Sequence, residues 1–168
     1  MMWRAATFAL LCALLLPVAQ VGAQSSRTQR LDDSSSPAAR LMVTPRWMHD
    51  SAGRELSDDQ MNALIAEVRG AEFRLDTEKF IGKQASIYLR LENPVRGLRT
   101  PSALRVQWTT RGKLRPGMLL PGERFLVFNG AVTERRMVDF FDFTIQIDGR
   151  HLDGGLEFQP VFEIDTVN

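Results

Sequence analysis

Apolar and polar residues alternate with a period of two along most of the chain after position 70, a pattern typical of β-strands that bury one face of a sheet. Pairs such as Asn129-Gly130 and Asp148-Gly149 mark turns between these stretches. With no helical pattern between them, we predict an all-β fold, an antiparallel β-sandwich of immunoglobulin-like or jelly-roll-like type. The predicted strands lie near residues 71–75, 87–91, 104–108, 125–128, 141–147 and 156–164.

Three irregularities refine this prediction. The strand starts are more widely spaced than is usual for a sandwich, which leaves room for a further short strand near residues 113–120. Pro160 interrupts the last alternation and indicates an edge strand or a bulge there, because proline cannot donate a ladder hydrogen bond. The pair Phe140-Phe141 breaks its alternation and indicates a bulge near Asp139.

One segment before the strands has the pattern of an amphipathic helix. Ser57 and Gln60 have the spacing of a capping box, in which each side chain bonds the backbone amide of the other. Four apolar residues follow at i, i+3, i+4 and i+7, and Gly70 is a typical helix stop. We therefore predict a helix over residues 58–69 that buries Met61, Leu64, Ile65 and Val68.

The first 23 residues have the features of a secretory signal peptide. Arg4 precedes an apolar run at residues 7–16, and Val21-Gly22-Ala23 supplies the small residues of a cleavage site. The run is too short for a membrane span, which needs about 20 apolar residues. Cys12 lies inside the run and lacks a lipobox, so lipidation is not expected. We predict cleavage and no membrane span in the mature protein.

The predicted mature chain begins with a polar segment. Residues 24–40 contain a single large aliphatic side chain, Leu31, and therefore bury too little apolar surface to order themselves. We expect a flexible leader over residues 24–40 and one β-sandwich domain over residues 41–168.

Composition narrows the possible functions. The chain has 168 residues, with 21 Lys and Arg against 20 Asp and Glu, and its single cysteine lies in the predicted signal peptide. An exported domain without disulfides must rely on its core for stability. The near-neutral charge also argues against nucleic acid as a partner. Among its basic residues the mature chain has far more arginine than lysine, which suits a bacterial protein that is periplasmic or secreted.

Motifs for catalysis or for a bound group are absent from the sequence. It contains neither a nucleophile elbow nor a phosphate-binding loop, and its two histidines, His49 and His151, belong to no local signature. We predict no enzyme activity, no metal site and no cofactor. Trp108 is in phase with buried positions and is expected in the core.

The distribution of charge is the one non-random feature. Residues 90–136 carry ten basic and three acidic residues, whereas residues 137–168 carry one basic and seven acidic residues. Opposite charges on neighbouring strands would pair across the sheet. Alternatively, the basic residues form a surface for an anionic ligand, for which the candidates are Arg105, Arg111, Lys113 and Arg115.

These observations lead to one expected function with two alternatives. We expect an exported, non-catalytic binding or assembly module that contacts another extracytoplasmic protein. The first alternative is a ligand-binding module for an acidic glycan or a lipid head group. The second is a small secreted hydrolase.

The signal peptide yields a first testable prediction. Mass spectrometry of the exported protein should find Gln24 at its N-terminus, because Ala23 ends the predicted cleavage site. An exported product that still begins at Met1 would contradict the predicted export route.

Overall fold

The computed structural model describes residues 27–38, 40–49 and 57–166. Within them the only α-helix is one turn, α1 (Asp58–Met61), and three short 3-10 helices span Glu78–Phe80, Pro101–Ala103 and Gly149–His151. The strands are β1 (Arg27–Arg30), β2 (Leu41–Val43), β3 (Arg46–Trp47), β4 (Ala63–Asp76), β5 (Gln84–Leu91), β6 (Leu104–Thr110), β7 (Gly117–Leu119), β8 (Arg124–Ala131), β9 (Arg136–Asp148), β10 (Leu156–Phe158) and β11 (Pro160–Thr166). The described part of the protein is therefore all-β, as predicted.

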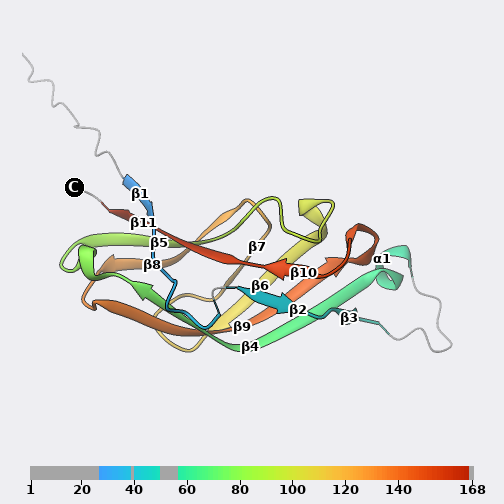
Figure 1. The fold of residues 1–168 in the computed structure, drawn as a ribbon, viewed down its shortest axis with the longest axis horizontal. Coiled ribbons are helices and arrows are strands. Elements are labelled where there is room, and N and C mark those ends of the chain that lie inside the picture. The colour runs from blue at the N-terminus through green and yellow to red at the C-terminus, as the bar shows by residue number, and fades with distance from the viewer. Residues whose placement is uncertain (1–26, 39, 50–56, 167–168) are drawn as a thin grey trace, which may run out of the picture.

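The strands form antiparallel sheets (Figure 1). A four-stranded sheet has the order β1-β11-β5-β8, and a five-stranded sheet has the order β3-β4-β9-β6-β7. Strands β10 and β2 form a separate two-stranded sheet. Strand β1 and the end of β11 lie at one end of the molecule, and α1 lies at the other.

Aromatic rings join the apolar faces of the sheets. The ring of Phe162 on β11 lies 5.2 Å from that of Phe73 on β4 and 5.9 Å from that of Phe141 on β9. On the far side of the core, Trp108 on β6 meets Phe125 on β8 edge to face at 5.2 Å. Tilted and edge-to-face ring pairs of this kind stabilise a core beyond their burial alone.

Trp108 is buried, as expected from its phase in the alternation. Its indole Nε1 donates to the backbone carbonyl of Arg115 at 3.0 Å, so burial leaves the polar group satisfied.

The predicted helix over residues 58–69 is wrong beyond its first turn. The amide of Ser57 does donate to the Gln60 side chain, at 3.2 Å, but the chain enters β4 at Ala63. Leu64 and Ala66 face the core, and Val68 is on the same side of the strand. Leu64 and Val68 are four positions apart and share a side in a strand as they do in a helix. The predicted burial of Met61 and Ile65 on the same face is wrong, because Met61 is 50% exposed and Ile65 lies on the opposite side of β4. Pairing with β9 along the length of β4 decided between strand and helix.

Gly70 marks a bulge in β4 and not the end of a helix. Its φ of +64° is in the left-handed region, and the register with β9 shifts between Val68 and Ala71. The amide of Gly70 donates to the Asp142 carboxylate at 2.6 Å. The bulge expected near Asp139 is wrong, because Asp139 pairs in regular register with Phe73 and the observed bulge is on β4. The pair Phe140-Phe141 keeps the alternation of β9, because Phe140 faces solvent.

The predicted strands after position 70 are present, several of them longer than expected. The further strand expected near residues 113–120 is β7. Strand β10 ends at Phe158, and Pro160 begins β11 one residue later. The irregularity that Pro160 marks in the alternation is therefore a switch of the chain from one sheet to another.

The expectation of a flexible leader over residues 24–40 is wrong for its described part. Strand β1 pairs with β11, and Leu31 is buried in the core. Further along, the Ser36 hydroxyl bonds both the amide and the carbonyl of Arg74 on β4. A polar segment orders here because its backbone completes the edges of preformed sheets, a gain that its own composition does not reveal.

The predicted signal peptide, residues 1–23, lies outside the described residues. Among the helices that the structure does describe, none is long and apolar enough to cross a membrane.

Adjacent phenylalanines on β9 test the core. Phe141 is fully buried and Phe140 is 40% exposed. We expect Phe141→Ala to lower the free energy of unfolding by about 3–5 kcal/mol, because it leaves a cavity between the sheets. The control Phe140→Ala should cost less than about 1 kcal/mol. Urea unfolding of both variants measures the difference. Equal losses would contradict the placement of Phe141 on the core side of β9 and of Phe140 on its solvent side.

Candidate functional site

The four basic residues singled out in the sequence have different surroundings. Arg111 and Lys113 lie in the loop after β6 and pair with Asp142, at 2.9 Å, and with Glu134. Arg105, on β6, and Arg115, before β7, are exposed and make no ion pair within the described residues. Half of the predicted candidates are therefore already neutralised by carboxylates.

Five of the ten basic residues in the basic stretch pair with the acidic stretch. Arginines between residues 90 and 136 form six ion pairs with carboxylates after residue 136. These are Arg90–Glu163 (2.9 Å), Arg96–Glu157 (3.2 Å), Arg99–Asp153 (3.5 Å), Arg111–Asp142 (2.9 Å), Arg124–Glu163 (2.9 Å) and Arg124–Asp165 (3.2 Å). This arrangement matches the cross-strand interpretation of the charge distribution.

Arg124 shows how the four-stranded sheet brings the two stretches together. Its guanidinium lies over the ring of Tyr88 on β5, with its Cζ 4.0 Å from the ring centroid. From there it reaches Glu163 and Asp165 on β11. Stacking and two carboxylates together hold this arginine to the sheet and reduce the positive charge that it offers to a ligand.

Asp139, which the sequence did not single out, positions the loop that bears Arg111 and Lys113. Its buried carboxylate accepts the backbone amides of Arg111 at 3.2 Å, Gly112 at 2.7 Å and Leu114 at 2.8 Å. A buried carboxylate is tolerated where it receives such bonds. Asp139 is therefore an anchor for the loop.

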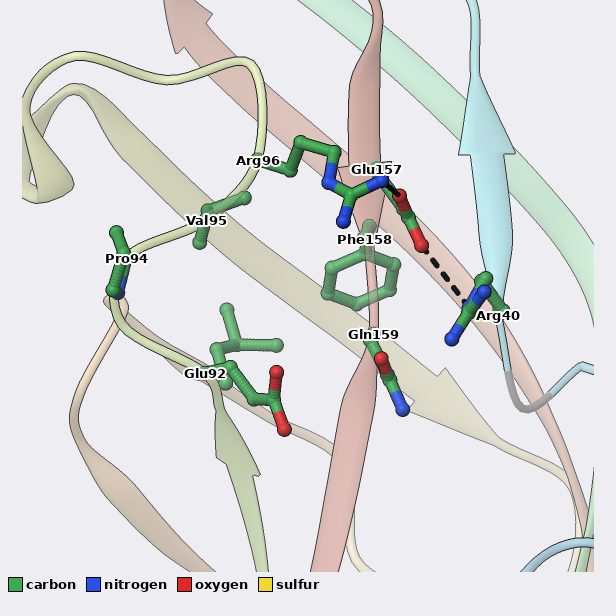
Figure 2. A pocket seen from close by; sticks show the side chains of 9 residues that line it. Arg40, Glu92, Pro94, Val95, Arg96, Glu157, Phe158 and Gln159 are labelled. Atoms are coloured by element: carbon green, nitrogen blue, oxygen red, sulfur yellow. Dashed lines mark ion pairs between the residues drawn. The ribbon is translucent and has the colours of Figure 1, made fainter.

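A hollow of the described surface lies where the chain switches sheets (Figure 2). Strand β10 pairs with β2, whereas β11 pairs with β5, and Gln159 is the residue between them. The two pairings diverge at this point and leave a space of about 540 Å³. It is lined by Arg40, Leu91, Glu92, Pro94, Val95, Arg96, Glu157, Phe158 and Gln159.

Glu157 lies between two arginines at the rim of this hollow (Figure 2). Its Oε1 is 3.0 Å from Nε of Arg40, and its Oε2 is 3.2 Å from a terminal nitrogen of Arg96. The carboxylate side chain is only 15% exposed, whereas the side chains of Arg40 and Arg96 are 69% and 82% exposed. A shielded anion thus holds two accessible cations, one on either side of it.

Glu92 and Gln159 lie on the other side of the hollow (Figure 2). The Glu92 carboxylate is 3.8 Å from Arg30 on β1, so it is weakly paired and half exposed. The buried side chains of Phe158 and Leu91 form the floor.

The loop that carries Arg96 packs tightly against the segment before β10. The amide of Glu157 donates to the carbonyl of Arg96 at 3.2 Å. At Gly97, which has a φ of +83°, a Cβ atom would lie 2.2 Å from the carbonyl oxygen of Gly155. Only glycine allows this approach, so the backbone beneath Arg96 is closely fixed.

A smaller hollow of about 240 Å³ contains Arg105 and His151. Nδ1 of His151 is 3.1 Å from the Thr100 hydroxyl, but its Nε2 is 4.0 Å from Asp148, beyond hydrogen-bond distance. The Asp148 carboxylate is instead bonded by Arg150. The geometry therefore lacks the oriented base of a hydroxyl-histidine-carboxylate triad. Within the described residues, no three side chains of the metal-binding kinds lie close enough to hold an ion.

Comparison with known proteins identifies no relative that would help to interpret this geometry. No protein-family model matches the chain. No curated protein matches it significantly. The site must therefore be interpreted from its own chemistry.

Sequence reasoning missed the hollow, because its charged residues come from separate parts of the chain. Arg40 lies in the segment expected to be flexible, and Glu157 is 117 positions later along the chain. Pro160 was the one available signal, since it marked the irregularity at which β10 and β11 separate.

The pairing of Arg111 with Asp142 has a measurable consequence. The side-chain hydrogen bonds from Arg111 and the backbone hydrogen bond from Gly70 hold the pKa of Asp142 below 3.8. The stabilisation is present above pH 3.8 and is lost as the pH falls through the lowered pKa of the folded state.

We expect Arg111→Gln to raise the pKa of Asp142 towards 3.8, as measured by NMR titration of its carboxyl carbon. Lys113→Gln is the matched control, because Lys113 pairs with Glu134 and not with Asp142. Equal pKa values of Asp142 in the two variants would contradict the pairing.

Proposed function

We propose that this protein is an exported, non-catalytic binding or assembly module of the bacterial periplasm or cell exterior, which acts through contacts with another protein. The domain responsible is interpreted as a β-sandwich of immunoglobulin-like or jelly-roll-like type. The facing of two antiparallel sheets across Phe73, Phe141 and Phe162 supports this interpretation.

The single observation that carries the proposal is the neutralisation of the basic stretch. Six ion pairs join its arginines to the acidic stretch, so its positive charge is largely balanced on the protein itself. A surface that binds a polyanionic glycan or a lipid membrane needs uncompensated positive charge. The balance favours a protein partner over these ligands.

Exposed apolar side chains support contact with a protein. Met42, Trp47, Met118 and Phe140 are each at least 40% exposed, and they lie on β2, β3, β7 and β9. Trp47 and Met118 belong to the two edge strands of the five-stranded sheet. Aromatic residues and methionine are enriched at protein interfaces.

The hydrolase alternative has less support. His151 lacks an oriented carboxylate partner, and the described residues show no pair of converging, unpaired carboxylates around a hollow. Glu157 and Glu92 share the hollow between β10 and β11, but both are paired with arginines.

Retention on an anionic matrix distinguishes a protein partner from an anionic ligand. We expect the purified protein to pass through heparin and to leave anionic lipid vesicles unbound at low salt, because most of its arginines between residues 90 and 136 are already paired. The comparison variant is Arg111→Glu/Lys113→Glu, which should behave in the same way. Retention that salt abolishes and that this variant loses would overturn the proposal in favour of an acidic glycan or lipid ligand.

A photo-crosslinking amino acid at position 140 supplies the second readout. Phe140 is exposed, so an aromatic crosslinker there should keep the fold and should form a discrete protein adduct in cells. The matched control is the same crosslinker at Tyr88, whose ring is covered by Arg124. Adducts that are equally frequent at both positions would contradict a specific protein contact.

A further inference from the structure

Two guanidinium groups share one carboxylate at the rim of the hollow between β10 and β11. Arg40 and Arg96 each make a single contact with Glu157, at 3.0 Å and 3.2 Å. A guanidinium has five N–H donors in a fixed planar arrangement, and so most of those on each group remain open to solvent. The rim therefore carries one unit of positive charge in excess and two adjacent sets of free donors.

The shielded carboxylate of Glu157 already holds the guanidinium groups of Arg40 and Arg96 in place. Their arrangement is therefore organised before any ligand binds. Glu157 is only 15% exposed and is fixed by its place in β10. The loop beneath Arg96 is fixed by the close approach of Gly97 to Gly155. Donors that are already held in place lose little conformational entropy on binding. This favours specific hydrogen bonds from arginine over general electrostatic attraction.

We propose that the hollow between Arg40, Arg96 and Gln159 binds a carboxylate of a partner polypeptide. This inference rests on the proposed function, which it extends by naming the chemistry of the partner. The carboxylate bridges the solvent-facing donors of the two arginines, opposite the position of Glu157. The amide group of Gln159 supplies a donor and an acceptor to the adjoining peptide backbone.

The other wall restricts which anions fit. Glu92 faces the same hollow, is half exposed and is balanced only by Arg30 at 3.8 Å. A phosphate dianion or a polyanionic chain would bring several negative charges towards this carboxylate, whereas a single carboxylate brings one. The hollow thus favours a monoanion, either an acidic side chain or the C-terminal group of a peptide.

Short capped peptides test this proposal. The probes are acetyl-Ala-Glu-Ala-amide, its neutral counterpart acetyl-Ala-Gln-Ala-amide and acetyl-Ala-Ala-Ala with a free C-terminus. The readout is NMR titration of the backbone amides of the purified protein at low salt. We expect the glutamate peptide to bind about tenfold more tightly than the glutamine peptide, as for one lost charge-assisted hydrogen bond. The third probe shows whether a C-terminal carboxylate binds at the same place.

The affected amides should lie at residues 92–97 and 157–159, which surround the hollow. Arg96→Gln should weaken binding by about tenfold for the same reason. Arg99→Gln is the matched control: Arg99 is exposed, lies three positions along the same loop and pairs with Asp153 away from the hollow. Arg96→Lys should only partly restore binding, because lysine keeps the charge but loses the planar donors.

Equal binding of the glutamate and glutamine peptides would overturn the proposal, as would binding that Arg96→Gln leaves intact. Absence of binding by every peptide, or amide shifts centred on Arg105 and His151, would overturn it as well. These failures are separable from that of the proposed function. A protein that binds no peptide here but ignores heparin and forms a specific adduct from position 140 remains a protein-binding module with another contact surface.

Discussion

The packing of aromatic rings between the sheets is the interaction on which the rest of the structure depends. The chain contains a single cysteine, so no disulfide within it can join the layers. Phe73, Phe141 and Phe162 meet instead across the core, and this contact fixes β4, β9 and β11 relative to one another. Burial of large aromatic side chains is among the strongest contributions available to such a domain.

That packing also determines which charges meet. The outer surface of each sheet carries the residues that alternate with the buried ones, so fixing the strand order fixes the neighbours of every charged side chain. Strand β11 lies next to β5, which places Glu163 within reach of Arg90 and, across Tyr88, of Arg124. Among the pairs that join the two stretches, an exposed one such as Arg99–Asp153 contributes only about 0–1 kcal/mol. Their consequence is the charge balance of the surface, not the stability of the fold.

The hollow arises from the same topology. One continuous segment pairs first with β2 and then with β5, and the two partners separate at Gln159. Pro160 suits this position, because its missing N–H requires no ladder partner where one pairing ends and the next begins. The space that remains collects charged groups from the segment before β2, the loop after β5, and β10. A potential binding site is therefore located at the least regular point of the fold.

The sequence by itself determined the all-β class, most of the strands, β7 among them, and the burial of Trp108, because the alternation of period two is a local property. It also located the two oppositely charged stretches. It did not determine the conformation of residues 63–69, because Leu64, Ala66 and Val68 fit one side of a strand while Leu64, Ile65 and Val68 fit one side of a helix, and only pairing with β9 decides between them. Nor did it reveal the order in residues 27–38, which bond to the edges of distant strands. The meeting of Arg40, Arg96 and Glu157 was likewise decided by tertiary structure alone, because it depends on where one chain segment leaves one sheet for another.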